Sequence, residues 1–516
     1  MQAEFITTEL IVAALLLIAA LVAWLTKLVR FPYTVGLVIV GVMITVLLPD
    51  KPQLAPELAR ELILLILLPP LVFEAALHIE FSEFRENLIA VLVFAIPGVL
   101  LTTVMVGWMM ATVTGLPLTT MLVFGALISA TDPVAVTAIF RDLGLPKRLG
   151  LLTECESLLN DATAIVVFTV LMEFALHPVD FNATQGAVEF LRVSGVGLLV
   201  GFGLGYVAYR LIRQIDDYLV ETVLSAVLAY GAYLLAEQVH ASGVLAVVAA
   251  GLMIGNSGRR YGMSHTTRVV LIHIWEFLAF LANSFVFLLI GLQVDLEKLA
   301  DGVWLLVAAI VVTLLARMVT VFGLSPLLNL FSSNRTPPAW QAVMVWGGLR
   351  GGIALALALT LPATLFGHSQ VLVMTFGVVL FTLGVQATTM PMVLRRLGLL
   401  RRGANPLEYE RRRARLAAAR AAEQYLQSQF KQGLLTRENY DLVLPPLHAE
   451  IEQFSGAVRE ALTALPDISD DELEATQLEI LETKRDMFRV LRHDGVVSTE
   501  VFRELTAEID ALISGR

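Results

Sequence analysis

Residues 117–140 read PLTTMLVFGALISATDPVAVTAIF, an apolar run that is interrupted by Thr131-Asp132-Pro133. The run exceeds the roughly 20 residues that a helix needs to cross a bilayer. Proline lacks the amide donor of a helix and moves the preceding residue away from helical angles, so we expect the helix to break here. Unwound backbone at membrane depth lines a cavity, where its carbonyls can bind cations. An ordinary proline kink is the alternative, which the adjacent aspartate disfavours.

The composition of the whole chain places this run in a membrane protein. Of 516 residues, 57% are hydrophobic and 16% are charged, whereas soluble domains average about 45–50% and about 25%. The net charge of −10 excludes an overall basic nucleic-acid binder. The single cysteine, Cys155, excludes an internal disulfide and any multi-cysteine metal site.

Charge is distributed unevenly along the chain. Residues 401–516 hold 16 basic and 21 acidic residues, whereas residues 1–400 hold 45 charged residues in all. We therefore predict a transmembrane domain over 1–400 and a soluble domain over 401–516.

Thirteen stretches of the first domain are long and apolar enough to cross a membrane. They are approximately 8–28, 33–49, 61–79, 87–113, 117–140, 150–176, 187–211, 218–238, 240–256, 270–293, 301–325, 339–362 and 369–397. With the N-terminus outside, the inside loops hold twelve lysines and arginines and the outside loops hold four. The positive-inside rule therefore places the C-terminal domain in the cytoplasm. We expect an all-α, multi-pass protein of the cell inner (plasma) membrane.

Eight charged side chains fall inside these apolar stretches. They are Glu74, Asp132, Glu154, Glu156, Asp161, Glu276, Arg317 and Arg350. A charge at the bilayer centre costs about 2.5–3.5 kcal/mol on the mildest scale, so such residues are functional candidates. Six acids against two arginines favour a cation or proton site over an anion site.

The sixth stretch begins with Glu154-Cys155-Glu156-Ser157-Leu158-Leu159-Asn160-Asp161. At helical spacing Ser157 and Asp161 share one face, and Glu156 and Asn160 share the neighbouring face. A hydroxyl and a carboxylate on one face are hard oxygen ligands suited to Na⁺. A polar helix that only packs against others through hydrogen bonds is the alternative.

The twelfth stretch contains Trp346-Gly347-Gly348-Leu349-Arg350-Gly351-Gly352. Four glycines around one arginine indicate either close helix packing or a second broken helix. Arg350 would need a buried acid as a partner, and we predict that Glu156 is that acid.

Together these three motifs resemble the NhaP-type sodium/proton antiporters of the first cation:proton antiporter family, over roughly residues 8–397. The resemblance implies that Asp161 binds cation and proton in turn, beside Asn160 in the Asn-Asp pair of electroneutral exchangers. The other Na⁺ ligands would be Asp132, Ser157, Glu74 and the backbone carbonyl of Thr131. Glu156 would form a structural ion pair with Arg350, and Arg317 would be the second arginine of the core.

The family fold implies inverted repeats, two crossing broken helices and a homodimer. Cys155 departs from the family pattern, in which glycine is expected. Burial and a neighbouring acid both disfavour the ionised form of a carboxylate, so Asp161 would hold either a proton or a metal ion. Alternating exposure of such a site to the two sides is sufficient for antiport of Na⁺ or Li⁺ against H⁺.

Three other functions stay open on the sequence: K⁺/H⁺ antiport, a cation channel gated by the C-terminal domain, and symport of an organic solute. The chain carries no hydrolytic, redox or nucleotide-binding motif, so we expect neither an enzyme nor a cofactor. In the C-terminal domain we predict a helix over 407–430 and another from Ser469 to about His493. Any regulatory ligand of this domain is not readable from the sequence.

Overall fold

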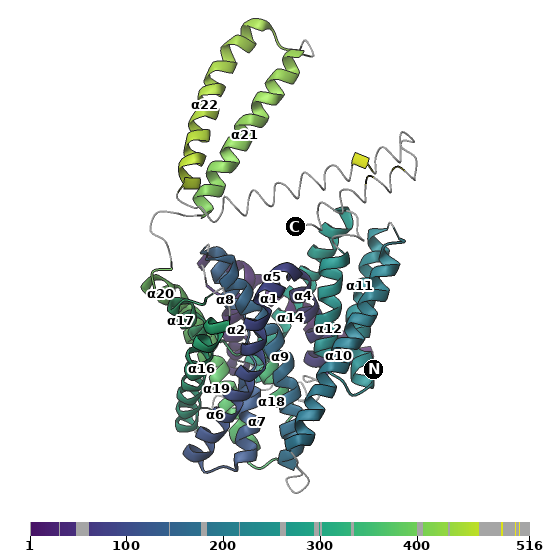
Figure 1. Cartoon of the computed structure of the whole chain (residues 1–516), viewed down its shortest axis with the longest axis vertical. Coiled ribbons are helices and arrows are strands. Elements are labelled where there is room, and N and C mark those ends of the chain that lie inside the picture. Colours follow the sequence, from purple (N-terminus) through teal and green to yellow (C-terminus); the bar gives the residue numbers. More distant parts are fainter. Residues whose placement is uncertain are drawn as a thin grey trace. The chain divides into compact units, whose positions relative to one another are not determined.

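The computed structural model describes residues 2–29, 31–47, 61–143, 145–176, 183–215, 217–258, 265–293, 302–331, 335–399, 406–431 and 434–463, with a few single positions besides. Every regular element in these ranges is a helix (Figure 1). The chain divides into two compact units, Met1–Leu400 and Arg401–Arg516.

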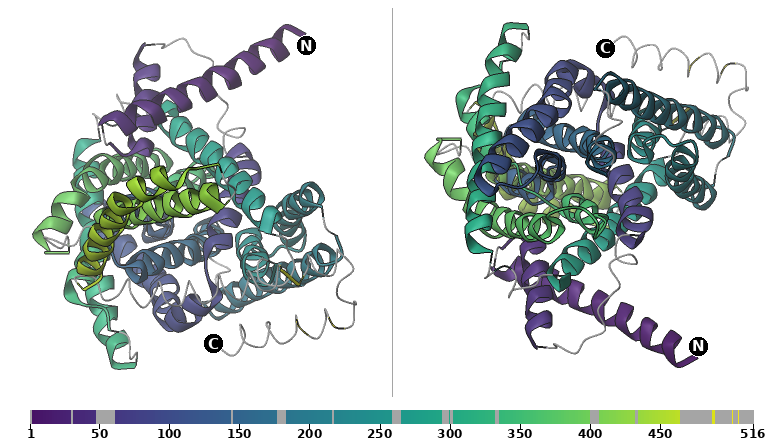
Figure 2. Two further views of the ribbon diagram at one scale, coloured as in Figure 1. Left: turned by 90° about the horizontal axis from the view of Figure 1, so that it is seen from above. Right: turned by 90° about the horizontal axis from the view of Figure 1, so that it is seen from below.

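The first unit is a bundle of α-helices with three short π-helices, labelled η. Its first half holds α1 (Gln2–Val29), α2 (Tyr33–Leu47), η1 (Leu62–Leu67), α4 (Leu68–His78), α5 (Phe81–Ala95), α6 (Pro97–Thr114), α7 (Leu118–Ser129), α8 (Val134–Asp142), α9 (Lys147–Leu176) and α10 (Ala183–Ile212). Its second half holds α11 (Tyr218–Gln238), α12 (Gly243–Met253), η2 (Ile254–Gly258), α14 (His265–Gln293), α16 (Val303–Phe331), α17 (Pro338–Trp346), α18 (Gly352–Leu359), α19 (His368–Phe381), η3 (Thr382–Ala387) and α20 (Thr388–Arg396). Figure 2 shows the bundle from above and below, with α1 (purple) projecting from its edge.

Among the described residues, eight helical segments are long and apolar enough to cross a membrane. Shorter apolar helices cover Ala13–Val29, Tyr33–Leu47, Leu62–His78 and Gly243–Asn256. Each of the thirteen predicted stretches carries helix, so the all-α membrane fold is confirmed. The number of thirteen crossings stays a prediction.

Two of the predicted stretches are broken helices. α7 ends at Ser129 and α8 begins at Val134, so the break at Thr131-Asp132-Pro133 is confirmed. The second break lies between α17 and α18, where Gly347 to Gly351 are not helical. The glycines also serve close packing, because a Cβ atom on Gly351 would collide with the side chain of Asp132. Both interpretations of the glycine-rich motif therefore hold at once.

The packing of α9 decides what the first break faces. This helix contacts α7, α5 and the shorter α8, and its residues Cys155 to Asn160 are buried apart from Leu159. At position 155, where the family pattern has glycine, the thiol is buried without a disulfide and packs in an apolar cluster with Leu152 and Leu158. The cysteine side chain therefore contributes to local apolar packing.

The second unit contains an antiparallel pair of helices, α21 (Pro406–Lys431) and α22 (Arg437–Thr463). Near their connection the rings of Phe430 and Tyr440 stack with centroids 4.4 Å apart. Further along, His448 Nε2 lies 2.9 Å from Glu423 Oε1. The predicted helix over 407–430 is confirmed by α21. The predicted helix from Ser469 to His493 lies outside the described residues.

Candidate ion-binding site

The face of α9 that carries Ser157 and Asn160 is bonded to the first break. The hydroxyl of Ser157 donates a short hydrogen bond to the backbone carbonyl of Thr131. The amide Nδ2 of Asn160 donates to Thr131 Oγ1 over 3.2 Å. These two bonds fix the unwound backbone against α9, so its oxygens lie beside those of the helix.

Asp132 belongs to both breaks. Its Oδ1 accepts a hydrogen bond of 3.0 Å from the backbone amide of Val134, which opens α8. Its own backbone amide donates to the carbonyl of Leu349 over 2.9 Å, and that carbonyl lies in the break between α17 and α18. The absence of a side chain at Gly351 lets the aspartate approach this backbone. The two breaks therefore meet at Asp132.

Asp161 lies one turn beyond Ser157 on α9 and faces the same place. The backbone amide of Thr131 approaches its carboxyl group, and Asp132 and Arg350 are close enough to act on its charge. Its Oδ1 is buried and has no hydrogen-bond partner, and the same is true of Asn160 Oδ1. Buried acceptors are almost always paired in native proteins, so two unpaired oxygens in one place indicate that a ligand completes them.

The predicted ion pair between Glu156 and Arg350 is wrong. Glu156 Oε1 lies 2.5 Å from Nη1 of Arg317 instead, and Arg317 also donates from Nε and Nη2 to the carbonyl of Met344 over 3.3 and 3.1 Å. The reason is the packing of the helices, because Arg317 on α16 reaches Glu156, whereas the Nη1 atom of Arg350 is taken up by the backbone carbonyls of Ser129 and Ala130. Helical spacing predicts the face of Glu156 but not the arginine opposite it.

Arg350 is held by backbone carbonyls. Its Nη1 donates to the carbonyls of Ser129 and Ala130 over 3.0 and 3.1 Å, at the point where α7 ends. Its backbone amide donates to Thr382 Oγ1 over 3.1 Å. The side chain is 1% exposed. Arg350 therefore ties the second break to the first and supplies a buried positive charge next to Asp161.

Glu74, the remaining predicted ligand, contacts a histidine on its own helix. Its Oε1 is 3.2 Å from Nδ1 of His78, and His78 Nε2 is 3.7 Å from Glu276 Oε1. Within the described ranges no hydrogen bond or ion pair joins Glu74 to Asp161 or its neighbours. The assignment of Glu74 to the same ion as Asp161 therefore stays a prediction, and in this structure Glu74 belongs to a charged group with His78 near the end of α4.

Two other acids of the predicted membrane stretches, Glu276 and Glu154, also have partners. Glu276 also contacts His273, with 3.1 Å between Oε2 and Nδ1. Glu154 is paired with Arg141, with 2.9 Å between Oε1 and Nη2. His78 is not among the predicted residues, although its spacing of four residues from Glu74 on a helix is a signal that could reveal it.

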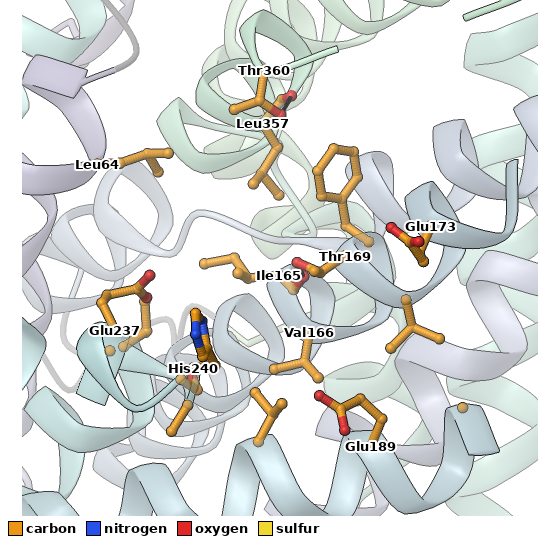
Figure 3. A pocket seen from close by; sticks show the side chains of 18 of the residues that line it. Leu64, Ile165, Val166, Thr169, Glu173, Glu189, Glu237, His240, Leu357 and Thr360 are labelled. Carbon is orange, nitrogen blue, oxygen red and sulfur yellow. Dashed lines mark hydrogen bonds between the residues drawn. The ribbon is translucent and has the colours of Figure 1, made fainter. Parts of the chain in front are cut away.

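A cavity of about 1000 Å³ borders the half of α9 that follows Asp161. Ile165, Thr169 and Glu173 line it (Figure 3), and their spacing of four residues continues the face of Ser157 and Asp161. Figure 3 also shows Glu189, Glu237 and His240 around the same space. Ile165 is one helical turn from Asp161 on α9, and the acids Glu173, Glu189 and Glu237 line the same cavity. Its lining comes from distant segments of the chain, which no local motif could predict.

Comparison with known proteins shows which family the chain belongs to. Residues 15–396 match the model of the transmembrane sodium/hydrogen exchanger family. The chain is 37% identical over 487 residues to the Na⁺/H⁺ antiporter ApNhaP of Aphanothece halophytica, covering 93% of this chain and 87% of the relative. It is 35% identical over 497 residues to the Na⁺/H⁺ antiporter NhaG of Bacillus atrophaeus, covering 94% and 93%.

The fold has a solved counterpart. The sodium proton antiporter MjNhaP1 of Methanocaldococcus jannaschii matches with a TM-score of 0.65 and 22% identity, over 76% of this chain and 99% of that one. The resemblance to NhaP-type antiporters is confirmed, and the chain belongs to the sodium/hydrogen exchanger family.

Proposed function

We propose that this chain exchanges Na⁺ or Li⁺ for H⁺ across the cell membrane, and that cation and proton compete for Asp161. The observation that carries the proposal is the unpaired, buried Oδ1 of Asp161 beside the unpaired Oδ1 of Asn160, at the point where two broken helices meet. Relatives that cover most of the chain are named Na⁺/H⁺ antiporters, which supports cation:proton exchange.

The oxygens around Asp161 suit a small hard cation. In addition to its own carboxylate they belong to Asp132, Asn160, the hydroxyl of Ser157 and the carbonyl of Thr131. Carboxylate, carbonyl and hydroxyl oxygens are the ligands that hard cations prefer. When Na⁺ binds, Asp161 is ionised. When a proton binds, the carboxyl group is neutral and the cation loses its strongest ligand.

The buried charges account for electroneutral exchange. Arg317 and Glu156 cancel each other. Summed over the whole site, the positive charge of Arg350 offsets one negative charge, which we assign to an ionised Asp132. A protonated Asp161 then leaves the site neutral, and an ionised Asp161 with Na⁺ leaves it neutral again. The empty, ionised site carries one negative charge, which is costly to move through a low-dielectric environment. Both loaded forms can therefore change sides, whereas the empty form cannot, and this couples the two ions.

The cavity along α9 offers one aqueous route to the site. On the orientation that the loop charges favour, Glu173 and His240 lie towards the outside, so this route opens outward. The homodimer follows from the family resemblance, and the cytoplasmic position of residues 401–516 follows from the loop charges. Both belong to the same proposal, as does a role in pH homeostasis.

Proteoliposomes test the proposal directly. A pH gradient reported by an internal dye should collapse when Na⁺ or Li⁺ is added, and clamping the membrane potential at different values should leave the rate unchanged. Asp161→Asn should abolish this response, whereas Asp441→Asn, an identical change on the exposed surface of α22, should retain it.

Each other outcome has a definite meaning. Full exchange in Asp161→Asn would refute the shared site. A rate that depends on the membrane potential would refute the charge balance. A response to K⁺ that exceeds the response to Na⁺ would replace Na⁺ by K⁺ as the substrate.

A further inference from the structure

A second and much smaller cavity lies beside Arg350, away from the oxygens of Asp161. It has a volume of about 10 Å³, close to the roughly 10–15 Å³ that one water molecule needs. Its walls come from α16, the break between α17 and α18, α19 and η3. The polar residues that line it are Thr313, Arg317, Arg350, Thr382 and Gln386.

Four buried polar atoms of this lining have no hydrogen-bond partner. They are Nε of Arg350, Nε2 and Oε1 of Gln386, and Oγ1 of Thr313. Arg350 and Gln386 are 1% exposed and Thr313 is 3% exposed, so bulk water does not reach them. Leaving such atoms unpaired destabilises the folded state. Buried waters typically make about three hydrogen bonds to groups of this kind.

The chemistry of the lining selects the occupant. Arg350 Nε can only donate, Gln386 Oε1 can only accept, and Thr313 can do either. An anion would satisfy the donors but not the glutamine oxygen. A cation would lie next to two guanidinium groups, those of Arg317 and Arg350, which repel it. Water both donates and accepts and carries no charge, so one molecule can accept from Arg350 Nε and donate to Gln386 Oε1 and Thr313 Oγ1.

We propose that one ordered water molecule bridges Arg350 Nε to Gln386 and Thr313, and that this water positions the guanidinium group for the ion site. The opposite edge of the same group, Nη1, holds the carbonyls of Ser129 and Ala130 at the end of α7. The bridge therefore fixes Arg350 from behind while Nη1 fixes the first break in front.

The π-helix η3 lies next to both the backbone and the side chain of Arg350. A π-helix closes its hydrogen bonds at i+5 instead of i+4, so Thr382 and Gln386, four residues apart, lie on nearly the same face. Thr382 Oγ1 accepts the backbone amide of Arg350, and Gln386 lines the cavity next to the side chain of the same arginine. The irregular helix therefore contacts Arg350 at both its backbone and its side chain.

A density map of the full chain in lipid nanodiscs, at a resolution that shows ordered water, tests the site without any transport measurement. We expect a single peak within hydrogen-bonding distance of both Arg350 Nε and Gln386. A closed cavity in which Gln386 bonds to Arg350 directly would overturn the proposal. So would a peak that is replaced by bromide when the protein is prepared in bromide salt, since it would then be an anion.

Variants at Gln386 test the positioning role, which rests on the proposed exchange of Na⁺ for H⁺. Gln386→Leu removes the polar atoms at similar size and should raise the KM for Na⁺ about fivefold, the effect of one lost buried hydrogen bond, with kcat nearly unchanged. Gln386→Asn keeps the amide beside the water and should restore most of the affinity. Gln341→Leu removes another buried glutamine, which bonds to Thr336, and should leave the KM unchanged.

Thermal stability tests the proposed water independently of the proposed transport function. If Gln386→Leu lowers the Tm of purified protein by more than Gln386→Asn does, the water stabilises the fold, even if the wild-type chain moves no Na⁺. An unchanged KM together with an unchanged Tm in Gln386→Leu would overturn the positioning role.

Discussion

Removing one partner of the buried pair Glu156–Arg317 should destabilise the fold strongly. The two side chains are 2% and 7% exposed, and their charged atoms lie 2.5 Å apart. Glu156→Gln leaves the guanidinium group of Arg317 with the neutral carbonyl of Met344 as an acceptor but without its carboxylate. Stranding one buried charge in this way costs about 3–5 kcal/mol, which lowers the ratio of folded to unfolded protein by about two to four orders of magnitude.

A double-mutant cycle measures this coupling. Arg317→Met should destabilise the fold by a similar amount, because it strands Glu156. The double variant should lose much less than the sum of the two single losses, since a neutral buried pair has no stranded charge. The measurement is the free energy of unfolding of detergent-solubilised protein, titrated with denaturing detergent and followed by tryptophan fluorescence.

A second cycle uses Arg350 as the matched control. The structure gives Arg350 carbonyl partners and no ion pair with Glu156 within the described ranges. Glu156→Gln and Arg350→Met should therefore show at most half of the coupling found with Arg317. Equal or larger coupling with Arg350 would refute the pairing of Glu156 with Arg317 and restore the pairing that the sequence predicts.

Three further predictions concern the ion site. Gly351→Ala should raise the KM for Na⁺ at least tenfold or prevent folding, because the new Cβ atom would collide with Asp132. The control is Gly150→Ala on α9, where a new Cβ atom meets no other atom within 4 Å. This control should leave the KM unchanged in the same proteoliposome assay. Thr131→Val removes the acceptor for Asn160 Nδ2 and should weaken Na⁺ affinity about fivefold. The affinity is measured from the Na⁺ dependence of dye recovery. An unchanged affinity would show that this hydrogen bond does not contribute to Na⁺ binding. Competition at one carboxylate predicts that, in the acidic range, the apparent KM for Na⁺ rises about tenfold per unit fall in pH while the maximal rate stays constant, and a KM independent of pH would contradict it.

Much of the site could be predicted because its residues lie in short motifs with a fixed local geometry. The break at Thr131-Asp132-Pro133 follows from the chemistry of proline, and the shared face of Ser157 and Asp161 follows from the helical repeat. Neither inference needs knowledge of the tertiary fold. The glycines beside Arg350 are compatible on sequence with either a break or close packing, and the structure shows that they serve both.

The pairings between distant segments could not be predicted in the same way. Glu156 and Arg317 are 161 residues apart, and nothing in the local sequence distinguishes Arg317 from Arg350 as the partner. The family resemblance assigns Glu74 to the ion, yet its contacts are set by the end of α4 and by Glu276 on α14. These distances depend on how the helices pack, which periodicity does not describe.

The contact between the two broken helices constrains the order in which the protein can fold during its synthesis. Arg350 Nη1 and the carbonyl of Ala130, which it binds, are 220 residues apart in the chain. During synthesis the first half must therefore enter the bilayer with the carbonyls at the end of α7 unpaired, and they wait for their partner until residue 350 emerges from the ribosome. Unpaired backbone in hydrocarbon costs several kcal/mol per group. A nascent chain that stalls before residue 350 has left the ribosome should thus be a preferred substrate for membrane quality control, and a chain that stalls after residue 350 has entered the bilayer should escape it.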